Sequence, residues 1–168
     1  MEKGFSVIGY EGRRLNVLIV EDNVNFRRLL RTILTTINVH DAMEVEDGES
    51  ALELLRTYPA DLVLLDWKME PMDGLTFIRR LRQGPDSPNP TLPVIMVSGY
   101  TDAALITQAR DAGVNEFLAK PISAKSLMSR VIAVMDTPRP FVKSSGYFGP
   151  DRRRKQVPLQ RGERRNQS

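Results

Sequence analysis

The sequence predicts an α/β fold with a doubly wound parallel sheet, and two observations support this. Short apolar runs rich in Val, Ile and Leu alternate with stretches whose apolar residues recur at helical spacing. The strand-then-helix order occurs five times, and right-handed crossovers place helices on both faces of one five-stranded sheet. The expected strands are Leu15–Val20, Val39–Val45, Leu62–Leu65, Val94–Val97 and Phe117–Ala119.

Each predicted strand is followed by a segment that has a helix-capping residue at its start. These helical segments follow Asn23, Asp47, Asp73, Asp102 and Ser123. Gly113 is placed to end the fourth helix, because glycine readily adopts the left-handed conformation of a helix stop. The proline-rich segment Gly84–Pro93 predicts an extended loop before the fourth strand.

The composition excludes several classes of protein. The chain has 168 residues, no cysteine and one histidine, His40, which excludes a disulfide framework, a thiolate zinc site and a multi-histidine metal site. No apolar run approaches the roughly 20 residues of a membrane span. Residues 1–14 lack the apolar core of a signal peptide. We therefore expect a cytoplasmic protein without membrane insertion.

The net charge of +3 conceals an asymmetry between two parts of the chain. Residues 1–138 contain 15 basic and 19 acidic side chains, whereas residues 139–168 contain 9 basic and 2 acidic ones. The apolar periodicity stops after Met135. We expect an N-terminal extension (1–14), one globular domain (15–135) and a basic, largely irregular C-terminal tail (136–168), too short for a core of its own.

Polar side chains with complementary chemistry follow four of the predicted strands. Ligands of open α/β sheets bind at the carboxyl ends of the strands. Taken singly, these residues are also typical of helix starts, turns and surface charges, but their joint placement favours one site. They are Glu21 and Asp22, Asp66, Ser98, and Lys120.

Three carboxylates this close together repel one another unless a cation lies between them. All-oxygen ligation without His or Cys favours Mg²⁺, with Mn²⁺ as the alternative. Lys120 adds a point charge suited to a phosphoryl group. The set predicts phosphoryl transfer to an aspartate, a reaction that requires mainly alignment and charge neutralisation.

These residues lie in segments that resemble the receiver domain of two-component response regulators of the chemotaxis-regulator type. The matching segments are Val17–Asn23, Leu62–Met69, Met72–Gly74, Pro93–Gly99 and Glu116–Pro121, and the resemblance covers roughly residues 15–134. It implies a flavodoxin-like (βα)5 sheet with strand order 2-1-3-4-5. It also implies a phosphoprotein switch rather than an enzyme, with an intrinsic autophosphatase activity.

Residue by residue, the resemblance implies a phosphoacceptor, a metal site and a switch. Asp66 would accept the phosphoryl group. The metal would be bound directly by Asp22, Asp66 and the backbone carbonyl of Lys68, and Glu21 would bind it through a water molecule. Ser98 and Lys120 would contact the phosphoryl group, and the Lys120–Pro121 bond would be cis. Phe117 would be the aromatic switch, its alternative role being that of a core aromatic. Movement of Ser98 toward the phosphoryl group would let Phe117 rotate inward.

Two side chains near the acceptor, Lys68 and Tyr100, are candidates for setting the lifetime of the phosphorylated state. Tyr100 would shield the acyl phosphate from water; the alternative is an exposed loop aromatic. The phosphodonor, a histidine kinase or a histidine phosphotransfer protein, would dock on an apolar patch formed by Phe26, Leu30 and their neighbours on the first helix with Pro121 and Ile122. The alternative is that some of these residues belong to the core, because helical spacing places Leu30 and Ile33 inward.

The output partner is not named by the sequence. It would bind the face formed by the fourth helix, fifth strand and fifth helix, or the tail. The tail contains a basic cluster, Arg152, Arg153, Arg154 and Lys155, near Tyr147 and Phe148. We favour protein docking (on a partner or on the acidic body itself) or a solvated tail over nucleic-acid binding. No helix-turn-helix fits in this length.

Two other classes of function are weighed and not favoured. A Mg²⁺-dependent phosphohydrolase with an aspartyl nucleophile usually has a second acid two residues after it, where this chain has Lys68. A nucleotide- or flavin-binding module would need a glycine-rich phosphate loop after the first strand, where Glu21 and Asp22 would instead repel a phosphate.

Overall fold

The structure is a computed structural model that describes residues 14–153. Five parallel strands form one sheet in the order β2-β1-β3-β4-β5, as the resemblance implied. The strands are β1 (Asn16–Val20), β2 (Asp41–Val45), β3 (Leu62–Asp66), β4 (Val94–Ser98) and β5 (Glu116–Ala119). The two central strands β3 and β4 are buried at every position, as continuous apolar runs predict.

Five helices connect the strands and begin at the capping residues that the sequence predicted. They are α1 (Val24–Thr36), α2 (Gly48–Leu54), α3 (Gly74–Gln83), α4 (Ala103–Ala112) and α5 (Ala124–Asp136). In each, the side chain of the preceding Asn, Asp or Ser accepts a hydrogen bond from a first-turn backbone N–H. Gly113 ends α4 with a left-handed φ of 105°.

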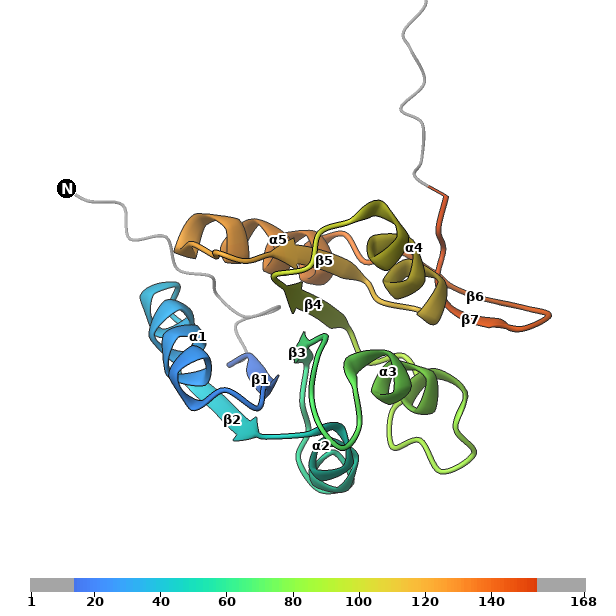
Figure 1. The fold of residues 1–168 in the computed structure, drawn as a ribbon, viewed down its shortest axis with the longest axis horizontal. Coiled ribbons are helices and arrows are strands. Elements are labelled where there is room, and N and C mark those ends of the chain that lie inside the picture. The colour runs from blue at the N-terminus through green and yellow to red at the C-terminus, as the bar shows by residue number, and fades with distance from the viewer. Residues whose placement is uncertain (1–13, 154–168) are drawn as a thin grey trace, which may run out of the picture.

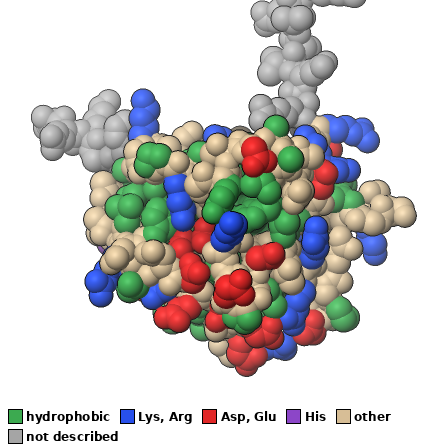
Figure 2. Space-filling model, in the orientation of Figure 1, with side chains coloured by type: hydrophobic (Ala, Val, Ile, Leu, Met, Phe, Trp, Pro, Cys, Tyr) green, Lys and Arg blue, Asp and Glu red, His purple; other side chains and the backbone are tan. Residues whose placement is uncertain are grey.

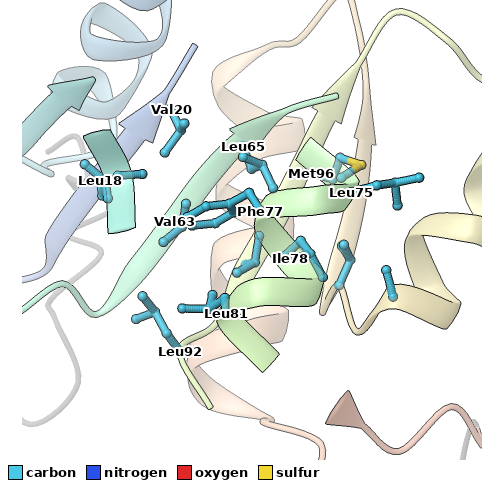
Figure 3. Close-up of a cluster of buried hydrophobic side chains, with 14 of the residues drawn as sticks. Leu18, Val20, Val63, Leu65, Leu75, Phe77, Ile78, Leu81, Leu92 and Met96 are labelled. Atoms are coloured by element: carbon cyan, nitrogen blue, oxygen red, sulfur yellow. The ribbon is translucent and has the colours of Figure 1, made fainter. Parts of the chain in front are cut away.

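The helices cover both faces of the sheet (Figure 1). Helices α1 and α5 pack on one face, and α2, α3 and α4 on the other. Figure 3 shows Phe77 and Ile78 of α3 lying against Val63 and Leu65 of β3. Phe77 is fully buried, so its truncation to alanine would cost about 3–5 kcal/mol. The core thus holds the carboxyl ends of the strands in fixed positions.

None of the helices in residues 14–153 is both long enough and apolar enough to cross a membrane.

The C-terminal region contains regular structure that the sequence interpretation did not foresee. We expected residues 136–168 to be largely irregular, but β6 (Phe141–Ser144) and β7 (Tyr147–Pro150) form an antiparallel hairpin. A two-residue turn, Ser145-Gly146, joins them, with a positive φ at Gly146. Strands of four residues carry too little periodicity to be recognised, and a lone hairpin is marginal in water. Packing against the domain stabilises this one.

The hairpin docks on α3 and on the turn that follows α4. The backbones of Gly149 and Gly113 approach so closely that a Cβ at Gly149 would lie 2.9 Å from the Gly113 Cα atom. The Tyr147 hydroxyl donates to the Pro150 carbonyl, and the rings of Phe141 and Phe148 lie 5.5 Å apart. The position of the hairpin therefore depends on glycine at two points in the chain.

Arg82 of α3 lies at the centre of this contact. Its guanidinium donates to the carbonyls of Gly113, Pro90 and Leu92 and to the Asn115 side chain, and it lies 4.9 Å from the Phe141 ring. Burial lowers the pKa of Arg82 to about 10, so the group stays charged at neutral pH. One buried cation thus links α3, the proline-rich loop, the start of β5 and the hairpin.

Candidate functional site

Three carboxylates meet at the carboxyl ends of β1 and β3. Glu21 and Asp22 follow β1, and Asp66 is the last residue of β3. One carboxylate oxygen from each lies within 4.8 Å of the others. Glu21 and Asp66 are buried, whereas Asp22 is exposed. Parallel strands that end at one edge of the sheet bring these residues together although they are far apart in sequence.

The ammonium group of Lys120 lies between two of these carboxylates. Its Nζ atom is 3.4 Å from Glu21 Oε2 and 3.4 Å from Asp66 Oδ1. The same atom lies 3.8 Å from the centre of the Phe26 ring. Lys120 follows β5, where its backbone N–H donates to the Ser98 carbonyl. The Lys120–Pro121 bond is cis, as the resemblance implied.

The electrostatics of the site favour binding of a cation. The pKa of Glu21 is raised to about 7, by burial first and by the Asp66 charge second, against the opposing effect of Lys120. Burial also raises the pKa of Asp66, while Lys120 opposes the rise. One ammonium group therefore compensates the three carboxylates incompletely. A divalent cation among their oxygens would stabilise all three in the ionised form.

Arg27 holds the loop that carries the acidic pair, and the sequence interpretation did not single it out. Its buried guanidinium donates to the backbone carbonyls of Glu21 (2.7 Å) and Asp22 (3.4 Å). It also pairs with Glu44 and Glu46 at the end of β2. The signal in the sequence was weak, because an arginine on an amphipathic helix is ordinarily a surface residue.

Gly74 allows α3 to begin against the end of β3. A Cβ at this position would lie 2.4 Å from the backbone oxygen of Asp66. The Gly74 N–H donates to the Trp67 carbonyl at 2.9 Å, which closes the loop after β3. The sequence predicts a helix start after Asp73, but the close approach of Gly74 to Asp66 is visible only in the structure.

Ser98 ends β4, the strand beside β3, and contacts Tyr100, which in turn contacts Lys68. The buried Ser98 Oγ accepts a hydrogen bond from the Tyr100 N–H at 3.0 Å. Tyr100 is 47% exposed, and Lys68 Nζ lies 4.3 Å from the centre of its ring. The two candidates for setting the lifetime of a modified Asp66 therefore contact each other.

The remaining predicted residues lie at two surfaces. Phe117 on β5 is half-buried, packs against the core formed with α2, α3 and α4, and lines a cavity with residues of α4. Phe26, Leu29 and Lys120 line a shallow pocket beside α1, and Leu29 is exposed, whereas Leu30 points into the core. Of the basic cluster, Arg152 and Arg153 are described; Arg154, Lys155 and the N-terminal residues 1–13 lie outside the described residues.

Comparison with known proteins decides the family. The model of the response regulator receiver domain matches residues 17–132, which is more than half of the chain. The chain belongs to the response regulator receiver family. It is a receiver domain of two-component signalling, a phosphoacceptor fold rather than a dedicated catalyst.

Several relatives of this receiver are chemotaxis proteins. It is 30% identical over 122 residues to chemotaxis protein CheY of Pseudomonas aeruginosa, covering 73% of this chain and 97% of that protein. It is 29% identical over 124 residues to chemotaxis protein CheY-3 of Vibrio cholerae, and the match covers 74% of this chain and 94% of that protein. The solved structure of chemotaxis protein CheY4 of V. cholerae superposes on this chain with a TM-score of 0.65 at 21% sequence identity. The match covers 73% of this chain and 99% of the CheY4 chain, and it shows that the two share a fold.

Proposed function

We propose that this receiver is a phosphorylation-dependent switch in which Asp66 accepts a phosphoryl group from a histidine kinase or a histidine phosphotransfer protein. One observation carries the proposal: the Asp66 carboxylate is buried within an acidic triad and lies 3.4 Å from Lys120 Nζ. Such a carboxylate has a counter-charge in place for the oxygens of a transferred phosphoryl group.

In the proposed reaction, an oxygen of Asp66 attacks the phosphorus of a phosphohistidine. The new O–P bond forms as the N–P bond breaks, and the imidazole nitrogen keeps the electron pair of that bond. Lys120 neutralises negative charge on the phosphoryl oxygens and keeps Asp66 ionised by opposing the rise of its pKa. Hydrolysis of the acyl phosphate by water, the intrinsic autophosphatase activity, would reset the switch.

The metal in this proposal is Mg²⁺ or Mn²⁺. The donor set is all oxygen, as these hard cations prefer. Asp22, Asp66 and the Lys68 carbonyl would bind it directly, and Glu21 through water. When bound, the cation would neutralise charge on the acceptor and on the transferring group. Arg27 positions this donor set by fixing the Glu21–Asp22 backbone.

The proposed switch runs from Ser98 to Phe117. Ser98 Oγ would exchange the N–H of Tyr100 for an oxygen of the phosphoryl group. The movement of the Ser98 segment would change the space available to the half-buried Phe117 ring. Phe117 lacks the hydroxyl of a tyrosine, so its state would be transmitted by packing to the surface of α4, β5 and α5. Such a switch would signal by binding other proteins. It would act in the cytoplasm.

Lys68 and Tyr100 would set how long the signal lasts. In this proposal their cation–π contact would cover the approach to Asp66 and slow the attack of water on the acyl phosphate. Tyr100→Ala should therefore lose phosphate faster than the wild type, whereas Tyr100→Phe keeps the ring and should behave normally. Equal dephosphorylation rates in all three proteins would rule out this role.

The test of the function is phosphorylation by acetyl phosphate with and without Mg²⁺, followed by intact-protein mass spectrometry. The wild type should gain one phosphoryl group in a Mg²⁺-dependent manner, and Asp66→Asn should gain none. Asp102→Asn is the matched control, because Asp102 caps α4 and asparagine caps helices equally well. An adduct on Asp66→Asn, or none on the wild type, would overturn the proposal.

A further inference from the structure

The ammonium group of Lys120 has an aromatic neighbour in addition to its two carboxylate partners. Lys120 Nζ lies 3.8 Å from the centre of the Phe26 ring, which is close enough for a cation–π interaction. The same atom lies 3.4 Å from Glu21 Oε2 and 3.4 Å from Asp66 Oδ1. Figure 2 shows acidic side chains in the middle of the visible face, near the ends of β1 and β3 in Figure 1, with basic and hydrophobic side chains beside them.

The position of the Phe26 ring is fixed by the start of α1. The Phe26 backbone N–H donates to the Asn23 side chain at 3.0 Å, and this hydrogen bond caps the helix. The ring is half-buried and packs against the core between the sheet and helices α1 and α5. Because its backbone and ring are both held, Phe26 offers Lys120 a surface that is ordered in advance.

Lys120 benefits from such a surface, because a lysine ammonium sits on a flexible four-carbon chain that loses much conformational entropy when it is ordered. The Lys120 side chain is 26% exposed, so water competes for its ammonium group. Phe26 and Leu29 line the shallow pocket beside it. In the proposed function Glu21 and Asp66 also serve the metal site, so of these three partners the Phe26 ring alone is independent of metal binding and protonation.

The first turn of α1 contacts the site from two sides. Phe26 contacts Lys120, and the next residue, Arg27, donates to the backbone carbonyls of Glu21 at 2.7 Å and Asp22 at 3.4 Å. Two successive residues of one helical turn therefore contact the cation and the acidic loop. This arrangement ties the position of Lys120 to that of the carboxylates it faces.

We propose that Phe26 is a positioning residue whose cation–π interaction holds Lys120 Nζ beside Asp66 for phosphoryl transfer. The proposal rests on the proposed function and deepens it, since it gives a role at the same site to a side chain outside the acidic triad. The role is separate from docking of a protein phosphodonor, because a small donor such as acetyl phosphate needs no docking surface. If Phe26 served packing alone, another apolar side chain of similar shape would replace it.

The test changes the electrostatics of the ring and keeps its shape. In the full chain, the Phe26 ring is replaced by its pentafluoro analogue, which lacks the negative face that attracts a cation. Phe26→Leu removes the ring, and Phe26→Tyr keeps its negative face. The two measurements are the rate of phosphorylation by acetyl phosphate with Mg²⁺ and the mobility of the Lys120 ε-methylene group by NMR relaxation.

The pentafluoro and Phe26→Leu proteins should be phosphorylated roughly threefold to tenfold more slowly than the wild type, and their Lys120 side chain should be more mobile. Phe26→Tyr should match the wild type in both measurements. Phe148→Leu is the matched control, because it also removes a half-buried phenylalanine ring, but from the hairpin beside Gly113, which precedes β5, whereas Lys120 follows that strand. It should leave both measurements unchanged.

The two measurements separate this proposal from the proposed function. In a wild type that is phosphorylated on Asp66, a pentafluoro protein that changes in neither measurement, or in only one, would overturn the positioning role of Phe26 alone. A wild type that is never phosphorylated would refute the proposed function. Increased mobility of Lys120 in the pentafluoro protein would then still support the hold of Phe26 on Lys120, and unchanged mobility would refute it.

Discussion

Lys120 Nζ lies 3.4 Å from Asp66 Oδ1, although 54 residues separate the two in the chain. The contact joins the ends of β3 and β5, which are not neighbours in the sheet. It opposes the effect of burial on the pKa of Asp66, which would otherwise favour the protonated carboxyl. The ionised carboxylate is the nucleophile in the proposed reaction, so this contact supports its reactivity.

Replacement of Lys120 by methionine should therefore slow phosphorylation of Asp66 by acetyl phosphate, by roughly tenfold to a hundredfold. The pKa values of Asp66 and Glu21 should also rise, because the favourable charge is lost. Mass spectrometry over time measures the rate, and NMR titration measures the pKa values. Lys125→Met, which removes an exposed lysine from α5, should leave both unchanged. An unaltered rate in Lys120→Met would contradict the role given to Lys120.

The stability of the metal-free protein should fall as the pH rises from about 4.5 to about 7. The Glu21 carboxyl has a pKa of about 7 in the folded protein, against an ordinary value of 4.5. Between these values the unfolded state releases its proton and the folded state keeps it, so the free energy of unfolding decreases with pH. Thermal unfolding across this range measures the effect.

Two comparisons isolate Glu21 as the cause of that slope. Glu21→Gln should flatten the pH dependence, whereas Glu53→Gln, which replaces an exposed glutamate on α2, should not. Mg²⁺ should raise the melting temperature more above pH 7 than below it, because protons compete with the cation for the same oxygens. A slope that Glu21→Gln leaves intact would show that another group causes it.

Gly74→Ala should destabilise the protein by about 1–3 kcal/mol, since the added methyl group would overlap the Asp66 carbonyl. The displaced loop follows Asp66, the proposed acceptor, so phosphorylation should slow as well. Urea unfolding measures the stability. Gly99→Ala is the control, because a Cβ at Gly99 would meet no atom within 4 Å; its stability should stay within about 0.5 kcal/mol of the wild type.

Arg82→Met should cost about 3–5 kcal/mol, because it leaves the carbonyls of Gly113, Pro90 and Leu92 buried without their donor. Since the guanidinium also lies against Phe141, the hairpin should loosen, and amide exchange across β6 and β7 should speed up. Arg79→Met, an exposed position on the same helix, should be nearly neutral. Unchanged exchange in Arg82→Met would show that the hairpin is anchored elsewhere.

Much of the fold and the identity of the site could be predicted from local patterns in the sequence. The buried runs of β3 and β4, the capping residues before the helices and the Gly113 stop each depend on nearby residues. The acidic and basic residues could be assigned to one edge because parallel strands all end there. Arg27 was missed, because its contacts with the Glu21 and Asp22 carbonyls have no counterpart in hydrophobic periodicity.

The sequence by itself determined the order of the elements, the family resemblance and the candidate residues at the strand ends, because alternating apolar runs and helix caps are local signals. Only the tertiary structure decided that Lys120 lies between Glu21 and Asp66, that Gly74 lies against the Asp66 backbone, and that the basic C-terminal region forms a hairpin over Arg82. Those contacts join residues far apart in the chain, and their energy comes from packing and burial that no short segment contains.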